Sequence, residues 1–126
     1  YSPQLPISVV PPGIDIEELN LKNSAKKPKF PLIIMCGYFD NKSNKDAALW
    51  FIKSIWPLIV SRNNKIQCWF IGKGINNEMI RVSLNKSNIT MIPDIDDLRP
   101  YRKLASVFIN PMRLGSGLRI KILEAM

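Results

Sequence analysis

Residues 67–91 read QCWFIGKGINNEMIRVSLNKSNITM and contain an apolar run, a glycine turn, an amphipathic stretch and a second apolar run. The pattern predicts a strand over 67–71, a turn at 72–74, a helix over 77–84 and a strand over 88–91. Alternation of apolar strands with amphipathic helices is typical of a parallel sheet that carries helices on its faces. Residues 67–91 therefore indicate a parallel sheet.

The same alternation continues on both sides of this unit. The further predicted elements are, in order, a strand over 31–36, a helix from Lys45 that Asn44 caps and Pro57 kinks, a short helix that Asp97 caps, a strand over 106–109 and a closing helix from Gly117. We therefore predict an α/β fold, a Rossmann-like parallel sheet with helices on both faces. Residues 32–126 would form this domain, incomplete at its C-terminus. The proline-rich residues 1–31 would form a linker from a preceding domain.

The chain is strongly basic, with 18 Lys and Arg against 10 Asp and Glu and a formal net charge of +8. This excess favours an anionic partner, which can be nucleic acid, anionic lipid or a phosphorylated small molecule. The aromatic residues lie mainly inside apolar runs rather than among basic residues, so a nucleic-acid surface is not expected. A solvated basic surface without a specific partner is the alternative.

The chain contains no histidine, which excludes histidine-based acid–base catalysis and histidine-containing metal sites in this segment. Cys36 and Cys68 fall inside predicted strands, where cysteine usually acts as a small buried hydrophobe. A reducing compartment is the expected setting. Asp94-Ile95-Asp96 has the form of an Asp-x-Asp motif, but it precedes a predicted helix and fits turn and capping roles better. We expect no metal and no cofactor.

Ligands of parallel α/β sheets bind beyond the carboxyl ends of the strands. The predicted loops at that edge are 37–44, 72–74, 92–94 and 111–117. In the last loop, Gly115-Ser116-Gly117 offers backbone N–H groups to an anion. A helix that begins at Gly117 would place Glu124 about 12 Å further on, on the same helix face as Ser116 and Ile120.

This spacing fits a nucleotide diphosphate, with phosphate at the glycine loop and ribose at Glu124. In the alternative, Glu124 forms an exposed pair with Lys121 that is worth roughly 0.2–0.5 kcal/mol. Spacing by itself does not choose between the two.

Residues 110–126, NPMRLGSGLRIKILEAM, resemble the nucleotide-sugar-binding segment of the family 4 (group 1) retaining glycosyltransferases. The resemblance continues in collinear order through parts of 93–101, 70–74, 37–59 and 9–15. It implies the C-terminal half of a GT-B fold, in which two Rossmann-like domains face a cleft and this half holds the donor nucleotide sugar. Residues 9–15 would then be the crossover from the missing N-terminal domain.

The resemblance also implies roles for single residues. Glu124 would bind the ribose hydroxyls, while Lys42, Arg119 and Lys121 would stabilise the leaving diphosphate. The donor site would consist of Gly37, Lys42, Gly72, Lys73, Ile92, Pro93, Gly115, Ser116, Gly117 and Glu124, with backbone groups near Ile92 and Pro93 on the base. Ser116 replaces the first Glu of the usual motif and can still hydrogen-bond a sugar hydroxyl or a phosphate. Tyr38 replaces a phosphate-binding Arg, which shifts that role to Lys42 or Lys73.

Several of these residues also have a purely structural interpretation. Gly72 and Gly74 can simply form the turn between a strand and a helix. Lys42 and Lys73 can be solvated surface charges. Pro93, with Asp94, can shape a turn.

We therefore expect a glycosyltransferase fragment that binds a nucleotide-diphosphate sugar. In the full-length protein it would transfer the sugar, with retention, to an acceptor sugar, lipid or polysaccharide in cell-envelope polysaccharide biosynthesis. The missing N-terminal domain would hold the acceptor, so the isolated fragment is expected to be inactive. The expected location is the cytoplasm, and the charge is also compatible with peripheral association at the inner face of the membrane. Two alternatives stay open: a nucleotide-sugar epimerase of the same architecture, and a basic, non-catalytic module that binds nucleic acid or anionic lipid.

Overall fold

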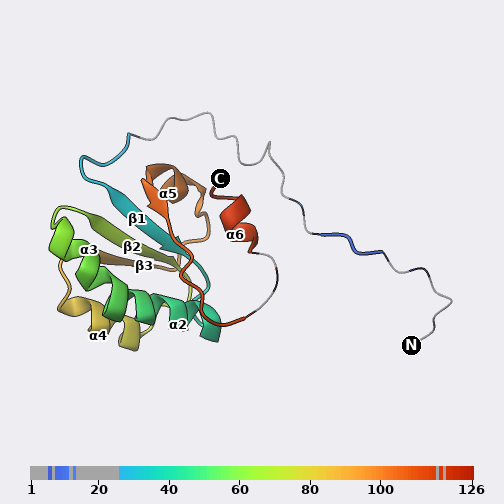
Figure 1. Ribbon diagram of the computed structural model, residues 1–126, viewed down its shortest axis with the longest axis horizontal. Helices are drawn as coiled ribbons and strands as arrows, with labels where there is room; N and C mark the ends of the chain where they lie inside the picture. The colour runs from blue at the N-terminus through green and yellow to red at the C-terminus, as the bar shows by residue number, and fades with distance from the viewer. Residues whose placement is uncertain (1–5, 7, 12, 14–25, 116, 118) are drawn as a thin grey trace.

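The computed structural model describes residues 6, 8–11, 13, 26–115, 117 and 119–126. The elements follow in the order β1 (Leu32–Cys36), α2 (Lys42–Trp50), the π-helical segment η1 (Phe51–Ile55), α3 (Trp56–Arg62), β2 (Gln67–Gly72), α4 (Asn77–Leu84), β3 (Ile89–Pro93), α5 (Arg99–Leu104), β4 (Val107–Phe108) and α6 (Ile120–Leu123). Strands and helices alternate along the chain, as the sequence pattern predicts (Figure 1). The predicted crossover over 9–15 lies partly outside the described residues.

Within the described part of the chain, four strands form one sheet in the order β3-β2-β1-β4, and every neighbouring pair is parallel. The central strand β1 is buried along its whole length. The chain runs from β1 outward to β3 and then returns to β4 on the other side of β1. The strand order therefore reverses between β1 and β4. In open α/β sheets such a reversal marks the crevice that binds ligands.

Helices cover both faces of the sheet, which confirms the predicted fold class (Figure 1). Successive side chains of β1 point to opposite faces, as strand geometry requires. Ile33 and Met35 belong to the core layer under α2, α3 and α4. Leu32, Ile34 and Cys36 belong to the layer under α5. Because both faces of β1 are covered, its sequence is apolar throughout rather than alternating.

Aromatic side chains fill the layer under α2. The rings of Phe39 and Phe51 both contact Phe70 edge-on, at centroid distances of 6.4 and 6.2 Å. Trp56 is buried beside Phe51, and its Nε1 donates a hydrogen bond to the carbonyl oxygen of Ser87 at 3.1 Å. This bond satisfies the buried indole N–H and ties α3 to the loop that leads into β3.

Helix α2 begins three residues earlier than predicted. Asn41 has an extended backbone, and its Oδ1 accepts from the N–H groups of Ser43 at 2.9 Å and Asn44 at 3.4 Å. The prediction that Asn44 caps this helix is therefore wrong, because another asparagine supplies the same capping chemistry one turn earlier. The predicted kink at Pro57 stays a prediction, but the helix changes its hydrogen-bond pattern just before this residue. The segment η1 interrupts the regular helix, and Pro57 lies in the first turn of α3, where its missing N–H is tolerated.

The closing helix is shorter than predicted. Gly117 has a φ of +87°, and Arg119 has φ −104° and ψ 86°, so neither is helical. α6 therefore begins at Ile120 rather than Gly117. The predicted 12 Å spacing and the predicted helix face shared by Ser116 and Glu124 both assumed a helix from Gly117, so they lose their basis. Ser116 itself lies outside the described residues.

Both cysteines are buried and unpaired, as the sequence predicts. Burial raises the pKa of the Cys36 thiol to about 11, against a smaller opposing effect of Arg102 and Lys121. Burial also raises the pKa of Cys68. Neither thiol is therefore a thiolate at neutral pH, and both behave as small apolar side chains.

Candidate ligand site at the carboxyl edge of the sheet

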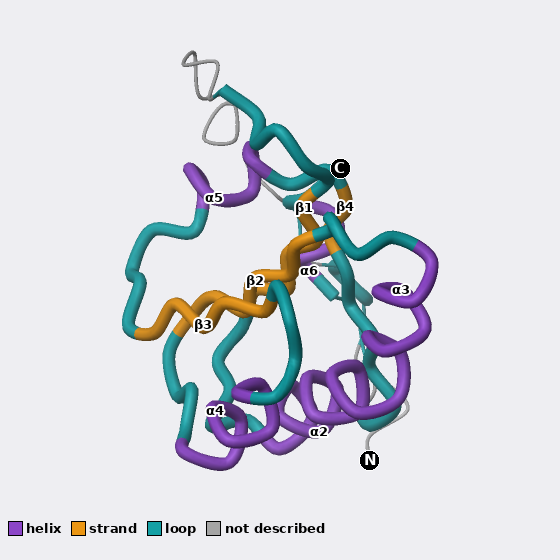
Figure 2. The backbone as a smooth tube through the Cα atoms, turned by 90° about the vertical axis from the view of Figure 1, so that its left-hand side faces the viewer, coloured by secondary structure: helices purple, strands orange, loops and turns teal. Residues whose placement is uncertain are grey.

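Three charged side chains converge on the carboxyl end of β1. Lys121 and Glu124 come from the C-terminal segment that contains α6, Arg102 comes from α5, and all three act electrostatically on the Cys36 thiol. Figure 2 shows α6 beside β1 and β4. These charges therefore border the point where the strand order reverses. We call Gly37, Asn44, Arg102, Lys121 and Glu124 the β1 corner.

Lys121 is half-buried and is held by neutral oxygen atoms. Its Nζ donates to Oδ1 of Asn44 at 2.9 Å and to the carbonyl oxygen of Cys36 at 3.4 Å. Burial lowers the pKa of this ammonium, and the nearby Arg119 lowers it further. Asn44 in turn donates through Nδ2 to the carbonyl oxygen of Tyr38 at 2.9 Å. The ammonium is thus fixed at the end of β1 by neutral hydrogen-bond acceptors, with the carboxylate of Glu124 near enough to act on its charge. A partly buried cation held in this way can receive an incoming anion.

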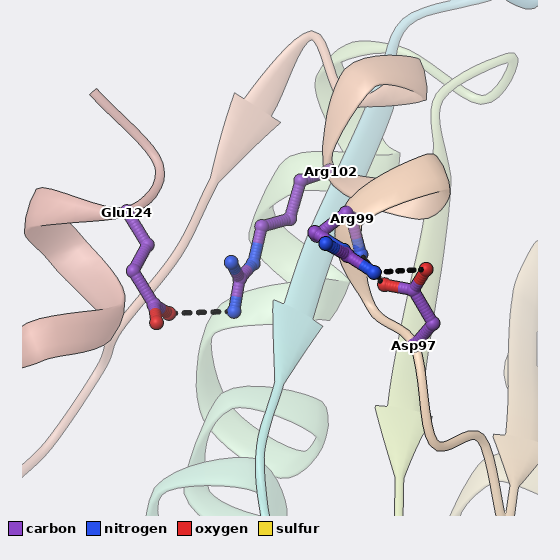
Figure 3. A network of polar contacts seen from close by, with 4 residues as sticks. All are labelled: Asp97, Arg99, Arg102 and Glu124. Carbon is purple, nitrogen blue, oxygen red and sulfur yellow. Dashed lines mark hydrogen bonds and ion pairs between the residues drawn. The ribbon is translucent and has the colours of Figure 1, made fainter. Parts of the chain in front are cut away.

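Glu124 follows α6 directly and pairs with Arg102 of α5 (Figure 3). Nη2 of Arg102 donates to Oε2 of Glu124 at 2.6 Å, and the side chains of Arg102 and Glu124 are 16% and 29% exposed. The alternative in which Glu124 forms an exposed pair with Lys121 is therefore wrong. Glu124 instead belongs to a contact between two helices, at the same strand end as Lys121.

The glycine loop after β4 folds back over the beginning of α2. Gly115 has a φ of +92°, and a Cβ atom there would lie 2.8 Å from Nη2 of Arg119 and 3.4 Å from Oγ of Ser43. Nη2 of Arg119 also donates to the carbonyl oxygen of Leu114 at 3.4 Å. A Cβ atom on Gly117 would have no heavy atom of another residue within 4 Å apart from its chain neighbours. The loop therefore brings the guanidinium of Arg119 close to Lys121, as the electrostatic effect of Arg119 on that ammonium also shows.

Arg113 anchors this loop to α2. Its Nη2 and Nε donate to the two carboxylate oxygens of Asp46, at 2.6 and 3.2 Å. The same guanidinium lies over the ring of Trp50, 5.1 Å from the ring centroid. A two-point arginine–carboxylate contact combined with a cation–π contact fixes orientation as well as position. The loop that carries Gly115 is thus held against the helix that carries Asn44.

Gly37 and Gly72 meet where β1 and β2 end. A Cβ atom on Gly72, which has a φ of +137°, would overlap the carbonyl oxygen of Gly37. One on Gly74 would overlap the backbone of Asp40. The structural interpretation of Gly72 and Gly74 is therefore supported, and their part in donor binding stays a prediction. Gly37 belongs to the β1 corner, because Nζ of Lys121 is 3.4 Å from its Cβ position.

The remaining predicted donor-binding residues line the same edge outside the β1 corner. Lys73 pairs with Asp96 at 2.6 Å, and this contact raises the pKa of the Lys73 ammonium. Lys42 is exposed in the first turn of α2. Ile92 and Pro93 end β3, which β2 separates from β1. The structure therefore gathers Gly37, Arg119, Lys121 and Glu124 and places the end of β3 two strands away.

Sequence reasoning missed the role of Arg102, which lies among the basic residues of α5. The available signal was its position. Leu98 and Ala105, four residues before it and three after it, both pack on the sheet, so Arg102 interrupts an apolar stripe of the helix. A charged residue in such a stripe requires a buried partner. Asn44 was predicted as a cap, and no local pattern shows that it reaches Lys121.

Two features are absent from the described part of the chain. No helix there is long and apolar enough to cross a bilayer. No group of three His, Cys, Asp or Glu side chains there lies close enough together to hold a metal ion.

Residues 30–126, which contain all the strands and helices given above, match the family described as Glycosyl transferases group 1. The chain belongs to this family. It is also similar to a protein of Klebsiella pneumoniae described as an uncharacterized 44.6 kDa protein in the cps region, with 27% identity over 112 residues that cover 80% of this chain and 29% of that protein. This glycosyltransferase chain therefore spans less than a third of that relative. The predicted resemblance to group 1 glycosyltransferases is confirmed.

Proposed function

We propose that this glycosyltransferase domain binds a nucleotide-diphosphate sugar at the β1 corner, as the donor-binding half of a family 4 enzyme with the GT-B architecture. The observation that carries the proposal is Lys121, a half-buried ammonium held at the end of β1 by the oxygen atoms of Asn44 and Cys36. Membership of the group 1 glycosyl transferases supports it. A partly desolvated ammonium attracts a diphosphate more strongly than an exposed lysine does, because the surroundings screen the charge less.

Lys121 and Arg119 would stabilise the diphosphate as it leaves. During transfer, the bond between the anomeric carbon and a diphosphate oxygen breaks, and the electron pair stays on the diphosphate. Cations that are already in place stabilise this growing charge without rearrangement. Lys42, exposed in the first turn of α2, is a third candidate on the same edge. In this proposal the cationic side chains neutralise the diphosphate, so the reaction requires no metal.

Because α6 is short, its N-terminal end contributes little to stabilising the leaving diphosphate. A helix of four residues has a weak dipole. The proposal therefore relies on the side chains of Lys121 and Arg119 rather than on the N–H groups of residues 115–117.

Glu124 would accept a hydrogen bond from a ribose hydroxyl. Its carboxylate and the ammonium of Lys121 both act on the Cys36 thiol, so ribose and diphosphate would lie next to each other at one strand end. Backbone groups near Ile92 and Pro93 would contact the base. The acceptor oxygen would bond to the anomeric carbon and lose its proton to a group outside this sequence. The family resemblance implies that the configuration at the anomeric carbon is retained.

The rest of the proposal concerns the full-length protein. A domain outside this sequence would hold an acceptor sugar, lipid or polysaccharide, and the product would be a cell-envelope polysaccharide. The similar Klebsiella pneumoniae protein, described as lying in a cps region, is compatible with such a role. The enzyme would work in the cytoplasm or at the inner face of the membrane.

The test is a calorimetric titration of the chain with uridine, guanosine and adenosine diphosphate sugars. We expect at least one of them to bind at or below millimolar concentration. Absence of binding for all three would contradict the proposal. Binding to DNA, RNA or anionic vesicles that weakens with salt, without preference for nucleotide sugars, would instead support a basic binding module. In the full-length protein, a glycoside product supports a transferase and a free epimerised sugar supports an epimerase.

A further inference from the structure

Arg102 is buried with an incomplete set of hydrogen bonds. Its side chain is 16% exposed, and Nη2 donates to Glu124 at 2.6 Å. Its Nε atom is buried and has no hydrogen-bond partner among the residues that the structure describes. Burying a guanidinium with an unpaired N–H is costly, and a buried ion pair adds little stability compared with an apolar pair of the same shape. A contribution to the stability of the fold therefore does not explain why an arginine lies at this buried position.

Arg99, one turn earlier on α5, makes a different kind of contact (Figure 3). Its Nε and Nη2 donate to the two oxygens of Asp97 at 2.8 and 3.1 Å, and the side chains of Arg99 and Asp97 are 41% and 48% exposed. The contact of Arg102 with Glu124 uses Oε2, so Oε1 lies outside it. A contact to one oxygen fixes the direction of a carboxylate and leaves the other oxygen able to accept a further hydrogen bond.

The segment that carries Glu124 needs such a contact because α6 is short. A helix of four residues is not stable by itself in water. Glu124 is the residue that ends it, and fixing a glutamate side chain in one rotamer costs conformational entropy. The contact with Arg102, 22 residues earlier in the chain, selects one rotamer before a ligand arrives.

We propose that Arg102 is a positioning residue for ribose recognition. It holds Oε2 of Glu124 so that Oε1 accepts a hydrogen bond from a ribose hydroxyl of the donor nucleotide. This role rests on the proposed function. Arg102 acts through Glu124 and does not itself contact the nucleotide. The cost of burying the guanidinium is then offset by the preorganisation of the carboxylate.

The experiment compares Arg102→Met and Arg102→Lys with the control Arg99→Gln in calorimetric titrations. The ligands are whichever of UDP, GDP and ADP binds most tightly to the wild type, and the 2′,3′-dideoxy form of the same nucleotide. We expect Arg102→Met to weaken binding of the ribose nucleotide about tenfold and to change binding of the dideoxy nucleotide less than about twofold. Arg102→Lys, which keeps one charged donor, should recover part of the loss. Arg99→Gln should change neither affinity.

Two outcomes would overturn this role. An equal loss for both nucleotides would show that Arg102 merely holds α6 in place, and tighter binding of the ribose nucleotide by Arg102→Met would show that Arg102 competes with ribose for Glu124. If Arg102→Met does not fold, Arg102→Lys carries the test. It should lower ribose discrimination in the wild-type background and leave it unchanged in a Glu124→Gln background, and an equal effect in both backgrounds would overturn the role.

Titrations of the wild type distinguish a failure of the role of Arg102 from a failure of the proposed donor site. A wild type that binds neither nucleotide contradicts the donor site itself, and the role of Arg102 fails with it. A wild type that binds the ribose and dideoxy nucleotides equally well keeps the donor site and overturns the role of Arg102.

Discussion

The two edges of the sheet carry different kinds of contacts. At the carboxyl edge, charged side chains join segments that are far apart in the sequence, as in the contacts of Arg113 with Asp46 and of Lys121 with Asn44. At the amino edge, the neutral donor Trp56 Nε1 hydrogen-bonds a main-chain carbonyl group, and Asn88 Nδ2 does the same. These two hydrogen bonds at the amino edge involve no charged group. At the carboxyl edge, charged side chains hold the loops in place.

Charge separates the two edges as well. The loops that lead into β1, β2 and β3 at the amino edge carry Lys29, Lys65 and Lys86 and no acidic residue between 26 and 31, 63 and 66 or 85 and 88. Most of the described acidic residues instead follow strand ends or lie in the first half of helices, namely Asp40, Asp46, Glu78, Asp94, Asp96 and Asp97, whereas Glu124 follows the end of α6. Helix dipoles favour part of this separation. We therefore expect that substitutions can alter stability and ligand binding separately, and four variants test this expectation.

The largest effect is expected from Gly72→Ala at the carboxyl edge. The added Cβ would overlap the carbonyl oxygen of Gly37, and a φ of +137° is unfavourable for alanine. We expect the free energy of unfolding to fall by more than about 4 kcal/mol, as measured by urea denaturation. Gly117→Ala is the matched control, because its Cβ position is open and only its φ of +87° is unfavourable, at a cost of about 1–2 kcal/mol. Similar small losses for the two variants would contradict the close contact of the two strand ends.

The next effect is expected at the amino edge, from Trp56→Phe. The change removes the hydrogen bond to the carbonyl oxygen of Ser87 and leaves a smaller ring at a buried site. The free energy of unfolding should fall by about 2 kcal/mol, while the affinity for a nucleotide diphosphate stays within about twofold of the wild type. Thermal denaturation and calorimetry measure the two quantities. A parallel loss of affinity would show that the edges are coupled.

Lys121→Met should produce the opposite pattern. Loss of the ammonium should lower the affinity for a nucleotide diphosphate about tenfold or more, which corresponds to about 1.4 kcal/mol. The free energy of unfolding should stay constant or rise, because the half-buried charge no longer has to be desolvated. A large loss of stability with unchanged affinity would contradict the role of Lys121 in anion binding.

The pH dependence of the wild type gives a second readout for Lys121. Its pKa in the folded protein is lowered below 10.5 by burial, so the unfolded chain binds more protons between the two pKa values. Nucleotide affinity should therefore fall as the pH rises through the folded pKa. Over the same range the stability of the wild type relative to Lys121→Met should increase, because the cost of the buried charge disappears. Parallel titrations of the two proteins at increasing pH check both signs.

The smallest effect is expected from Lys65→Gln at the amino edge. Lys65 is exposed, and its Nζ lies 5.9 Å from the centroid of the Phe30 ring. The free energy of unfolding should change by less than about 0.5 kcal/mol, and nucleotide affinity by less than about twofold, in the same denaturation and calorimetric assays. A loss of affinity comparable to that of Lys121→Met would place an anion site on the amino edge and contradict the assignment of ligand binding to the carboxyl edge.

The parts of the fold that sequence predicted well are those with strong local signals. Helix α4 has the predicted bounds, because Asn76 caps it through the N–H of Met79 and apolar residues repeat along one face. The central strand β1 follows from an uninterrupted apolar run that ends at Gly37. In both cases the deciding interactions join neighbours in the chain.

The parts that could not be predicted depend on contacts between distant segments. The pattern of residues 115–126 suits a helix from Gly117, but that glycine has a positive φ and α6 begins only at Ile120. The link between Arg102 and Glu124 connects two helices, and nothing in either local pattern specifies it. The resemblance to group 1 glycosyltransferases predicted Lys121 as a diphosphate-binding residue, yet its burial against Cys36 follows only from the packing of α6 on the strand end.

The strand pairings of β1 differ in length, and this difference sets which strand detaches first during local unfolding. β1 pairs with β2 at five positions, whereas it pairs with β4 through Val107 and Phe108. Local unfolding that breaks the fewest hydrogen bonds therefore detaches β4 first, so its amide protons should exchange with solvent sooner than those of β2. Arg113 contacts Asp46 of α2 rather than the sheet, so detachment of β4 does not itself break this link to the following loop.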